Sequence, residues 1–403
     1  NDEDNSGVLR YVSIRHGGTQ LGAANEINGL TLGGVGSGTI IEHVEVVSND
    51  DDGIEFFGGS VNVRYASVMF CGDDSFDWDQ GYHGKGQFWF TIQGQDAGDR
   101  GGELDGDDSP DVTADGMPFA LPTVANWTVI GRGSNVGNQG LLFRAGTGGH
   151  VSNAIIANIS EGIEIEDKQD PSDAYDKWVA GDLTLGNIAF DGVNEVIDYD
   201  GIQVADGDEQ LDAYAVTANL TAMTTGIDYN WATNGAGTAF SNPFNPVPDA
   251  SVLLDASAQP ADPWFETALF MGAFDPNGEN WLEGWTYADD SGAIEEEVAT
   301  CDCPPLGDRN EVIISDASGN GTGTTTWTCD NTYLLDGYVF VNDGQALTIE
   351  PGTVIKGMAG QGADAAALIV ARGGQIYADG TETCPITFTF EADPLDGSVS
   401  YDT

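Results

Sequence analysis

Carboxylate side chains cluster at two points of the chain that have similar surroundings. Each cluster precedes or enters a short apolar segment that ends in glycine or glutamine-glycine. The members are Asp50, Asp51, Asp52, Asp73, Asp74, Asp77 and Asp79. Hard oxygen ligands suit Ca²⁺, and close like charges are unfavourable without a cation. The clusters therefore predict a calcium site, and the alternative is a solvated acidic surface of a salt-adapted protein.

A second acidic segment lies around residues 95–122 and interrupts the strand pattern, so we expect a long acidic loop there. Its candidate calcium ligands do not follow the EF-hand spacing, and no GGxGxD repeat accompanies them. These candidates are Asp99, Glu103, Asp105, Asp107, Asp108 and Asp111.

Paired carboxylates could instead act as the acid and base of glycoside cleavage. The best group for this chemistry is Asp73 and Asp74, together with the Tyr-His-Gly-Lys segment at 82–85. A lyase that acts on acidic sugars needs Arg or Lys to hold the uronate and take its proton, and the chain has only 12 such residues. The sequence contains no Gly-x-Ser-x-Gly, P-loop or HExxH motif. We therefore expect no catalysis, with a polysaccharide-binding or polysaccharide-cleaving protein as the alternative.

Aromatic residues lie at strand spacing beside the acidic clusters. They could form a sugar-binding platform, but aromatic residues at this spacing are more often stacked in a core. The residues are Phe56, Phe57, Phe76, Trp78, Phe88, Trp89 and Phe90.

The chain of 403 residues is strongly acidic, with 66 Asp and Glu against 12 Lys and Arg and a formal net charge of −54. Such a surface repels nucleic acid and anionic lipid and attracts divalent cations. The sequence has no apolar run of the roughly 18 residues that a membrane span needs. Because the chain begins at Asn1 without an initiator Met or a signal peptide, we expect a processed or cut end. We expect an extracellular or cell-surface location.

Short strands that repeat along the chain must position these side chains. Residues 52–59 align with 74–81 at an offset of 22, and residues 140–143 align with 162–165 at the same offset. Strand-like segments at such a period, with Gly, Asn and Asp between them, are typical of stacked coils that need a neighbour above and below. Crossings between parallel strands are right-handed. The sequence therefore predicts an all-β, right-handed parallel β-helix, and no segment has a convincing helical period.

Composition divides the chain into four regions. Residues 1–240 are expected to form coils, and residues 309–403 form a second set of coils. Residues 241–290 are rich in proline and aromatic residues, so we expect an irregular layer packed on the side of the coils. Residues 291–308 are acidic and contain prolines and cysteines, which predicts a linker.

Five cysteines are too few for a disulfide scaffold in a chain of this length. Cys301 and Cys303 have no second cysteine pair and no histidine nearby, so zinc is not expected. Cys329 and Cys384 are a candidate disulfide in the C-terminal part. The odd number of cysteines leaves one thiol free or available to another chain.

Several stretches are similar to one known family. DNTYLLDGYVFVNDGQALTIEPGTVIKG and AALIVARGGQIYADGTETCPITFTF resemble the opening coils of secreted right-handed β-helix proteins of marine bacteria, often found in the Bacteroidota. NSGVLRYVSIRHGG, EINGLTLGGVGSGT and DDGIEFFGG resemble later coils of the same family. The resemblance covers about two thirds of the chain. It implies the fold and no particular activity, because most members have no assigned function.

The order of these coils departs from the family, because the opening coils come last here. We therefore expect residues 309–403 of one subunit to stack under residues 1–90 of the next, as subunits of an extracellular filament or surface array stabilised by calcium. The alternative is one repeat cut from a longer tandem chain. Both interpretations predict a linear array of copies joined head to tail. Polysaccharide is a further candidate partner, whereas nucleic acid and membrane insertion are not expected.

Overall fold

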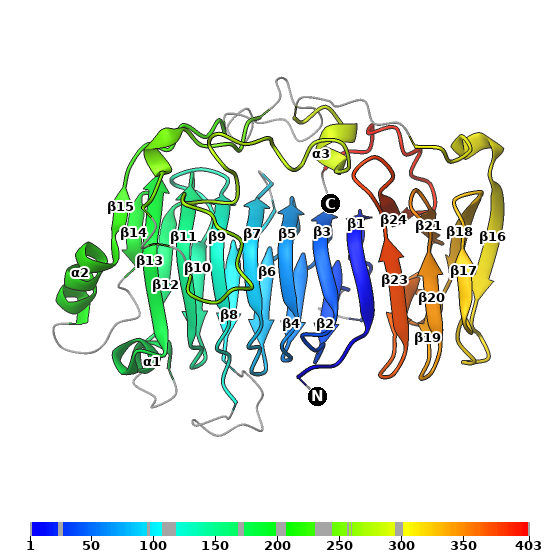
Figure 1. Cartoon of the computed structure of the whole chain (residues 1–403), viewed down its shortest axis with the longest axis horizontal. Coiled ribbons are helices and arrows are strands. Elements are labelled where there is room, and N and C mark those ends of the chain that lie inside the picture. Colours follow the sequence, from blue (N-terminus) through cyan, green and yellow to red (C-terminus); the bar gives the residue numbers. More distant parts are fainter. Residues whose placement is uncertain are drawn as a thin grey trace.

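The computed structural model shows one long solenoid of stacked coils (Figure 1). The structure describes residues 2–22, 27–94, 97–106, 118–167, 173–198, 207–229, 244–255, 258, 260–294 and 301–401. Neighbouring strands pair in parallel and in register along the whole stack. The predicted fold class, a right-handed parallel β-helix, is confirmed.

The larger sheet contains 15 of the described strands. These are β1 (Gly7–Arg15), β3 (Ile40–Val47), β5 (Asn62–Met69), β7 (Lys85–Ile92), β9 (Thr123–Ile130), β11 (Gly149–Ala157), β13 (Leu183–Asp191), β15 (Leu220–Ala222), β16 (Asn310–Ser315), β17 (Thr325–Trp327), β18 (Asn331–Asp336), β20 (Ala346–Ile349), β21 (Val354–Gly357), β23 (Gln375–Asp379) and β24 (Ile386–Phe390). The long, odd-numbered strands from β1 to β13 bend near their middle. The two halves of β1 therefore pair with two separate strands, β23 and β24.

A residue with positive φ makes each of these bends. The position is aromatic in the first long strands, such as Tyr11 and Tyr65, and it is asparagine from β9 onward, with φ of 60° at Asn126 and 57° at Asn153. Asparagine tolerates this left-handed conformation better than most residues. The asparagines also form a ladder, because Asn187 donates a hydrogen bond from Nδ2 to Oδ1 of Asn153 at 3.0 Å. The bend is thus stabilised between coils.

Two smaller sheets complete the coils. The first has seven strands: β2 (Leu30–Gly33), β4 (Ile54–Phe57), β6 (Phe76–Asp79), β8 (Gly102–Asp105), β10 (Gln139–Arg144), β12 (Glu161–Ile165) and β14 (Glu195–Asp198). The second pairs β19 (Tyr338–Val341) with β22 (Ala367–Val370). Strand β8 lies inside the segment that we expected to be one long acidic loop. That expectation is wrong for Gly102–Asp105, because these residues pair with β6 and β10.

The core fills the inside of the solenoid with stacked apolar side chains. Phe56, Phe76 and Trp89 are fully buried, and their rings stack with centroids 4.5 Å apart between Phe76 and Trp89. Trp127 meets the edge of Phe76 at 5.3 Å. Phe56 and Phe76 come from the seven-stranded sheet and Trp89 from the larger sheet. Rings that meet between the sheets bury a large area and add stacking energy. The predicted aromatic core is therefore present.

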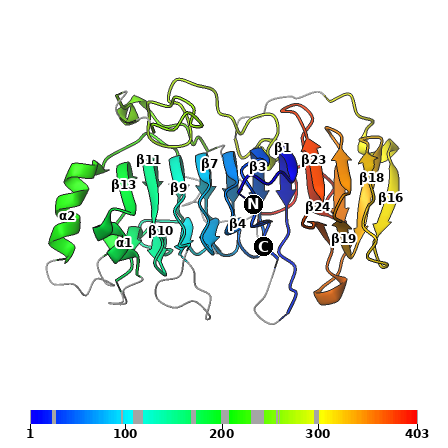
Figure 2. The ribbon, with the colours of Figure 1, turned by 60° about the horizontal axis from the view of Figure 1, so that its bottom comes forward.

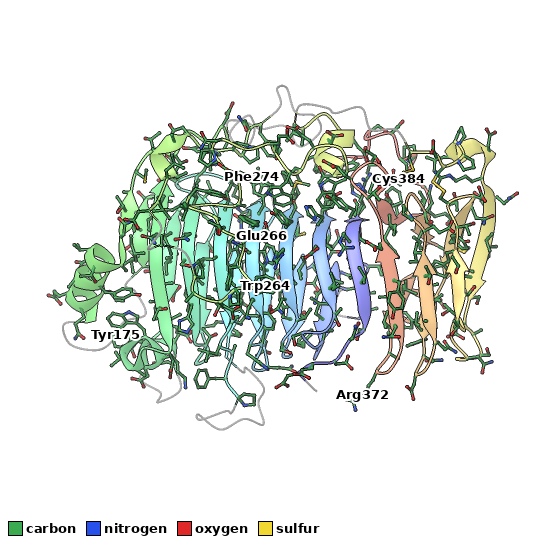
Figure 3. The ribbon with its side chains drawn as sticks, viewed as in Figure 1. Tyr175, Trp264, Glu266, Phe274, Arg372 and Cys384 are labelled. Carbon is green, nitrogen blue, oxygen red and sulfur yellow. A yellow bond between two sulfur atoms is a disulfide. The ribbon has the colours of Figure 1, made fainter. Side chains whose placement is uncertain are left out.

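Residues 244–255, 258 and 260–294 belong to a strap that runs along the outside of the larger sheet (Figures 1 and 3). Phe274, labelled in Figure 3, belongs to a second buried cluster that also contains Met69 and Phe90 of the sheet. Gly272 of the strap donates from N–H to the Asn153 carbonyl at 2.8 Å, and its φ of 87° and closeness to Ile155 leave no room for a side chain. The strap covers the second halves of the long strands, which explains why these halves are buried on both faces.

Three α-helices occur among the described residues, although the sequence shows no clear helical period. They are α1 (Ala174–Ala180), α2 (Gly207–Ala218) and α3 (Tyr287–Asp290). Short 3-10 turns are η2 (Ala250–Val252), η4 (Leu306–Asp308) and η5 (Gly362–Asp364). Helix α1 is capped by Asp173 and ends at Gly181 with φ of 86°. These helices lie outside the coils, and Figure 2 shows α2 at one end of the solenoid.

The coils after the strap stack on the first coil of the same chain. Gly7 to Arg10 pair with β23, and Val12 to Ile14 pair with β24 (Figure 1). Arg10 strengthens the joint through an ion pair with Asp379 at 2.5 Å. The contact that we expected between two subunits is thus made within one chain. The strap is long enough to bring the C-terminal coils back beneath β1, and the sequence pattern alone did not reveal this.

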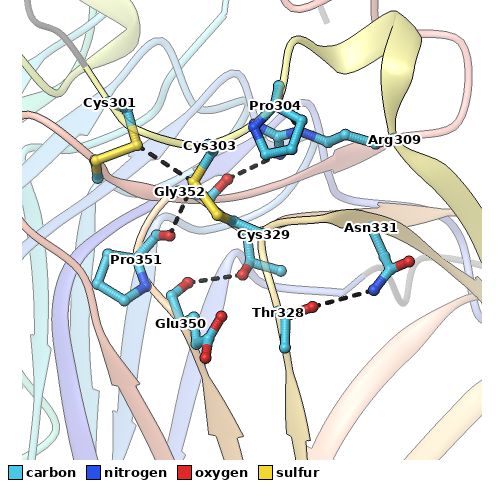
Figure 4. Close-up of a disulfide and its surroundings, with 12 residues drawn as sticks. Cys301, Cys303, Pro304, Arg309, Thr328, Cys329, Asn331, Glu350, Pro351 and Gly352 are labelled. Atoms are coloured by element: carbon cyan, nitrogen blue, oxygen red, sulfur yellow. Dashed lines mark hydrogen bonds between the residues drawn. A yellow bond between two sulfur atoms is a disulfide. The ribbon is translucent and has the colours of Figure 1, made fainter.

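Two disulfides fasten the segment that follows the strap (Figure 4). Cys301 pairs with Cys384, and Cys303 pairs with Cys329. The predicted Cys329–Cys384 bond is wrong, because both cysteines bond to the 301–303 segment, whose sulfur atoms lie against Gly352. Cys71 is free and buried, so the expectation of one free thiol is confirmed. The expected linker is therefore covalently attached to the C-terminal coils.

Candidate cation site on the seven-stranded sheet

Acidic side chains form a row on the outer face of the seven-stranded sheet. The second residue of β4 and of β6 points outward, because its neighbours in each strand are fully buried. The register continues this row through Thr31, Glu55, Asp77, Glu103, Leu142, Glu164 and Asp198. Parallel strands lie about 4.8 Å apart, so the carboxylates of adjacent strands face each other at close range.

Asp52 and Asp74 occupy equivalent turns directly before β4 and β6. Oδ1 of Asp52 accepts a hydrogen bond from the backbone N–H of Asp74 at 3.0 Å, and Oδ1 of Asp74 accepts one from the N–H of Arg100 at 2.6 Å. Each aspartate therefore fixes the turn of the next coil. The predicted equivalence of the two turns is confirmed, and these carboxylates have a structural role whether or not an ion binds.

Three carboxylates meet beside these turns. Oxygen atoms of Asp52, Glu55 and Asp77 lie within 4.8 Å of one another. Burial, reinforced by the nearby Glu55 charge, raises the pKa of Asp52 to about 8, and burial raises the pKa of Glu55 to about 7. Burial also raises the pKa of Asp77 well above its usual value, and Oδ1 of Asp77 has no hydrogen-bond partner among the described residues. No described Arg or Lys forms an ion pair with this triad, and a divalent cation could supply the missing positive charge.

Two further triads adjoin the first. Asp51, Asp52 and Asp73 form one, and Asp73, Asp74 and Asp99 form the other, each with oxygen atoms within 4.8 Å. Asp73 is exposed to solvent, whereas Asp52 is only 8% exposed. Water screens exposed carboxylates well, so the more buried triad of Asp52, Glu55 and Asp77 has the greater need for a cation.

Two arginines lie among the carboxylates of the neighbouring strands. Arg100 forms ion pairs with Asp99 at 2.5 Å and with Glu103 at 2.7 Å. Arg144 forms ion pairs with Glu103 at 2.8 Å and with Asp105 at 2.7 Å. Burial still raises the pKa of Glu103, although both arginines oppose the shift. The face thus combines a carboxylate triad that forms no ion pair with any described residue and an ion-paired region next to it.

The structure separates the predicted ligands into groups. The triads contain Asp51, Asp52, Asp73, Asp74 and Asp77. Asp50 is on the exposed side of its turn and belongs to no triad, whereas Asp79 and Asp105 end the strands β6 and β8. Asp107, Asp108 and Asp111 lie outside the described residues. The predicted cluster is therefore present in part, with its centre at the first two turns.

The alternative acid and base group does not come together. Lys85 starts β7 in the larger sheet, and its Nζ pairs with Asp262 of the strap at 2.5 Å. Tyr82 is fully buried and donates its hydroxyl to the Val61 carbonyl at 2.9 Å. The less favoured interpretation of the aromatic residues, a sugar-binding platform, does not hold for the described residues, because Trp78 and most of the neighbouring aromatic rings are in the core.

Sequence reasoning missed three residues of this face: Glu55, Arg100 and Arg144. The offset of 22 residues places Glu55 over Asp77, so the repeat contained the signal for an acidic row. The arginines had no such signal. Arg100 and Arg144 fall after changes in coil length, and only the strand register shows that Arg144 lies opposite Asp105.

A family model described as a pectate-lyase like beta helix domain matches residues 1–241 and 319–399. These segments make up more than half of the chain, so the protein belongs to this family of β-helix proteins. No curated protein and no solved structure matches the chain. Among the described residues, no helix has both the length and the apolar composition to cross a membrane.

Proposed function

We propose that the protein is an extracellular β-helix that binds an acidic polysaccharide through calcium held on the outer face of the seven-stranded sheet. The observation that carries the proposal is the buried triad of Asp52, Glu55 and Asp77, in which Oδ1 of Asp77 has no hydrogen-bond partner in the described part of the chain. The family description supports the ligand class, because pectate is a polymer of uronic acid. A carboxylate of the polymer would complete the oxygen shell that three protein carboxylates leave open.

The arginines give the same face a second means of holding a polyanion. Arg100 and Arg144 both pair with Glu103. A calcium ion that draws nearby carboxylates into its shell would leave part of the guanidinium groups to a uronate, which arginine binds in a bidentate manner. Two disulfides fit an oxidising extracellular compartment, and proteins of such a family are often secreted.

The test is binding of a soluble polyuronate to the whole protein by calorimetry, in calcium and in chelator. We expect binding to be at least about tenfold weaker in chelator than in calcium, and we expect a loss of the same size for Asp77→Asn in calcium. Asp336→Asn, which changes an exposed aspartate at the end of β18, is the matched control and should bind normally. A neutral galactan should not bind. Equal polyuronate binding in chelator would contradict the proposal. Formation of unsaturated product by the wild type and its loss in Asp77→Asn would assign cleavage to the same face.

A second candidate function is the filament subunit. The observation that favours it is the end of the larger sheet at β16, whose outer edge pairs with no described strand. Ile313 of this strand is 62% exposed. Strand edges with unpaired backbone groups associate readily, so copies could join at this end, with calcium stiffening the acidic turns. Electron microscopy with and without a chelator tests this candidate, and single particles under both conditions would exclude it.

A further inference from the structure

A cavity of about 460 Å³ lies away from the acidic face, on the C-terminal coils. Strands β16, β18 and β21 form its floor through Glu311, Thr332 and Lys356. The turn η4 forms one wall, and residues 393–395 form the other. Small-molecule sites usually measure about 300–1,000 Å³, so one or two sugar units fit this volume.

The two basic residues of the cavity, Arg309 and Lys356, are unusual in this acidic chain. Most other described arginines pair with carboxylates, as Arg10 does with Asp379 and Arg144 with Asp105. Arg309 and Lys356 form no ion pair with any described residue. Burial therefore lowers the pKa of Arg309, and only Asp330 opposes this shift. An anion in the cavity would supply the charge that the protein does not.

Both cations are held in place by backbone carbonyls. Arg309 donates from Nε to the Pro304 carbonyl at 2.8 Å and from a terminal nitrogen to the Gly352 carbonyl at 2.9 Å (Figure 4). Lys356 donates from Nζ to the carbonyls of Glu391 at 3.1 Å and Asp393 at 2.6 Å. A guanidinium has five N–H donors and an ammonium has three, so both groups keep donors for a ligand.

Neither acidic residue of the cavity neutralises these cations. Asp393 is 1% exposed, and its two oxygens accept hydrogen bonds from the Thr389 hydroxyl at 2.6 Å and from the Leu395 N–H at 2.8 Å. Glu311 is exposed and forms no ion pair with Arg309 or Lys356. The remaining wall is apolar, with Leu306 and Leu395. A pyranose ring offers C–H groups to such side chains, and its polar groups could face the cations.

The wall that carries Arg309 is fixed before any ligand arrives. The Cys301–Cys384 and Cys303–Cys329 bonds attach the segment just before it to two coils (Figure 4). Preorganised groups lose less conformational entropy on binding, so a rigid wall favours affinity.

We propose that this cavity binds one carboxylate-bearing sugar unit, with Arg309 and Lys356 contacting the carboxylate. The site extends the proposed function to a second place on the molecule, and it requires no calcium. Its failure is therefore distinguishable from failure of the acidic face, because the two sites are tested in chelator and in calcium respectively.

The experiment is titration of galacturonate into the whole protein in chelator, followed by saturation-transfer NMR and calorimetry. We expect saturable binding that galactose, the neutral match, does not show. Arg309→Gln should weaken binding at least about tenfold, and Arg309→Lys should weaken it less, because it retains the charge. Lys356→Gln is a second variant that leaves the disulfide-fixed wall unchanged. The control is Arg372→Gln, an exposed arginine at the opposite edge of these coils from Cys384 (Figure 3).

Three results would overturn the proposal. The first is equal binding of galactose and galacturonate, which would remove the role of the carboxylate. The second is binding of inorganic sulfate without binding of galacturonate, which would assign the cavity to small anions. The third is unchanged affinity in both Arg309→Gln and Lys356→Gln, with thermal transitions that show both variants to be folded.

Discussion

Replacement of Asp52 by asparagine should stabilise the protein in the absence of calcium, and the gain should depend on pH. Asp52 is only 8% exposed, and its pKa rises from 3.8 to about 8, chiefly because of burial. Between about pH 4 and pH 8, the folded state therefore binds a proton that the unfolded state has lost. The contribution of this proton to the free energy of unfolding is complete below pH 4 and is lost as the pH rises toward 8. Asparagine keeps the acceptor for the N–H of Asp74, which lies 3.0 Å from Oδ1 of Asp52.

The size of the gain follows from the pKa of Asp52 in the unfolded and folded states. Each pH unit above the unfolded pKa of 3.8 costs the folded state about 1.4 kcal/mol, until the folded pKa is reached. Near pH 7, the burial of Asp52 therefore opposes folding by up to about 4 kcal/mol. Asp52→Asn should recover an amount of this order near pH 7 and almost nothing near pH 4. Added calcium should stabilise the wild type in the same way, and it should stabilise the variant less.

The assay is urea unfolding in chelator at several pH values, with the difference between variant and wild type as the readout. The difference is needed because burial also lowers the pKa of His16 and His43 to about 4, so the protein loses stability on acidification for a separate reason. Asp336→Asn serves as the control, because Asp336 is exposed. A gain of the same size near pH 4 and near pH 7 would refute the reasoning.

Other predictions concern the scaffold. Asn153→Ala should destabilise the protein by about 2–4 kcal/mol, because it removes hydrogen bonds to Ala258 at 3.1 Å and from Asn187 at 3.0 Å at a residue with φ of 57°; an unchanged urea midpoint would contradict this. Phe76→Ala should lower the free energy of unfolding by about 3–5 kcal/mol, because it removes the stack on Trp89. A loss no larger than that of a substitution at an exposed position would contradict this, because it would mean that the coil collapses into the space. Reduction of both disulfides should lower stability by about 2–4 kcal/mol for each bond, measured by calorimetry with and without reductant, and no change would mean that the 301–303 segment is held by packing alone.

The repeat in the sequence predicted the fold well because strand register repeats with it. The offset of 22 residues corresponds directly to the pairing of Ile54 with Phe76 and of Leu141 with Ile163. Helix α1 was missed although Asp173 and Gly181 are good capping residues. A helix of seven residues is too short to be stable alone and depends on packing against the coil, which a local pattern does not contain.

Only the two acidic turns of the candidate site were predictable from the sequence. Asp52 and Asp74 could be found because their turns are equivalent, whereas Arg144 lies opposite Asp105 only after an insertion has shifted the register. The disulfides show the same limit. Cys301 and Cys384 are separated by 83 residues, and their pairing depends on where the strap returns to the coils. Contacts that cross the strap are set by tertiary structure, so spacing along the chain does not determine them.

The return of the C-terminal coils to β1 has a consequence for how the polypeptide is made. Arg10 and Asp379, which meet at the joint, are 369 residues apart in the chain. A ribosome therefore releases β1 well before β23 and β24 exist, and one edge of β1 stays open during most of synthesis. Pairings so distant in sequence form late, because a long loop must close before they gain anything. We expect the coils from β3 to β13 to form first through their near neighbours, and the joint at β1 to be the slow final step of folding.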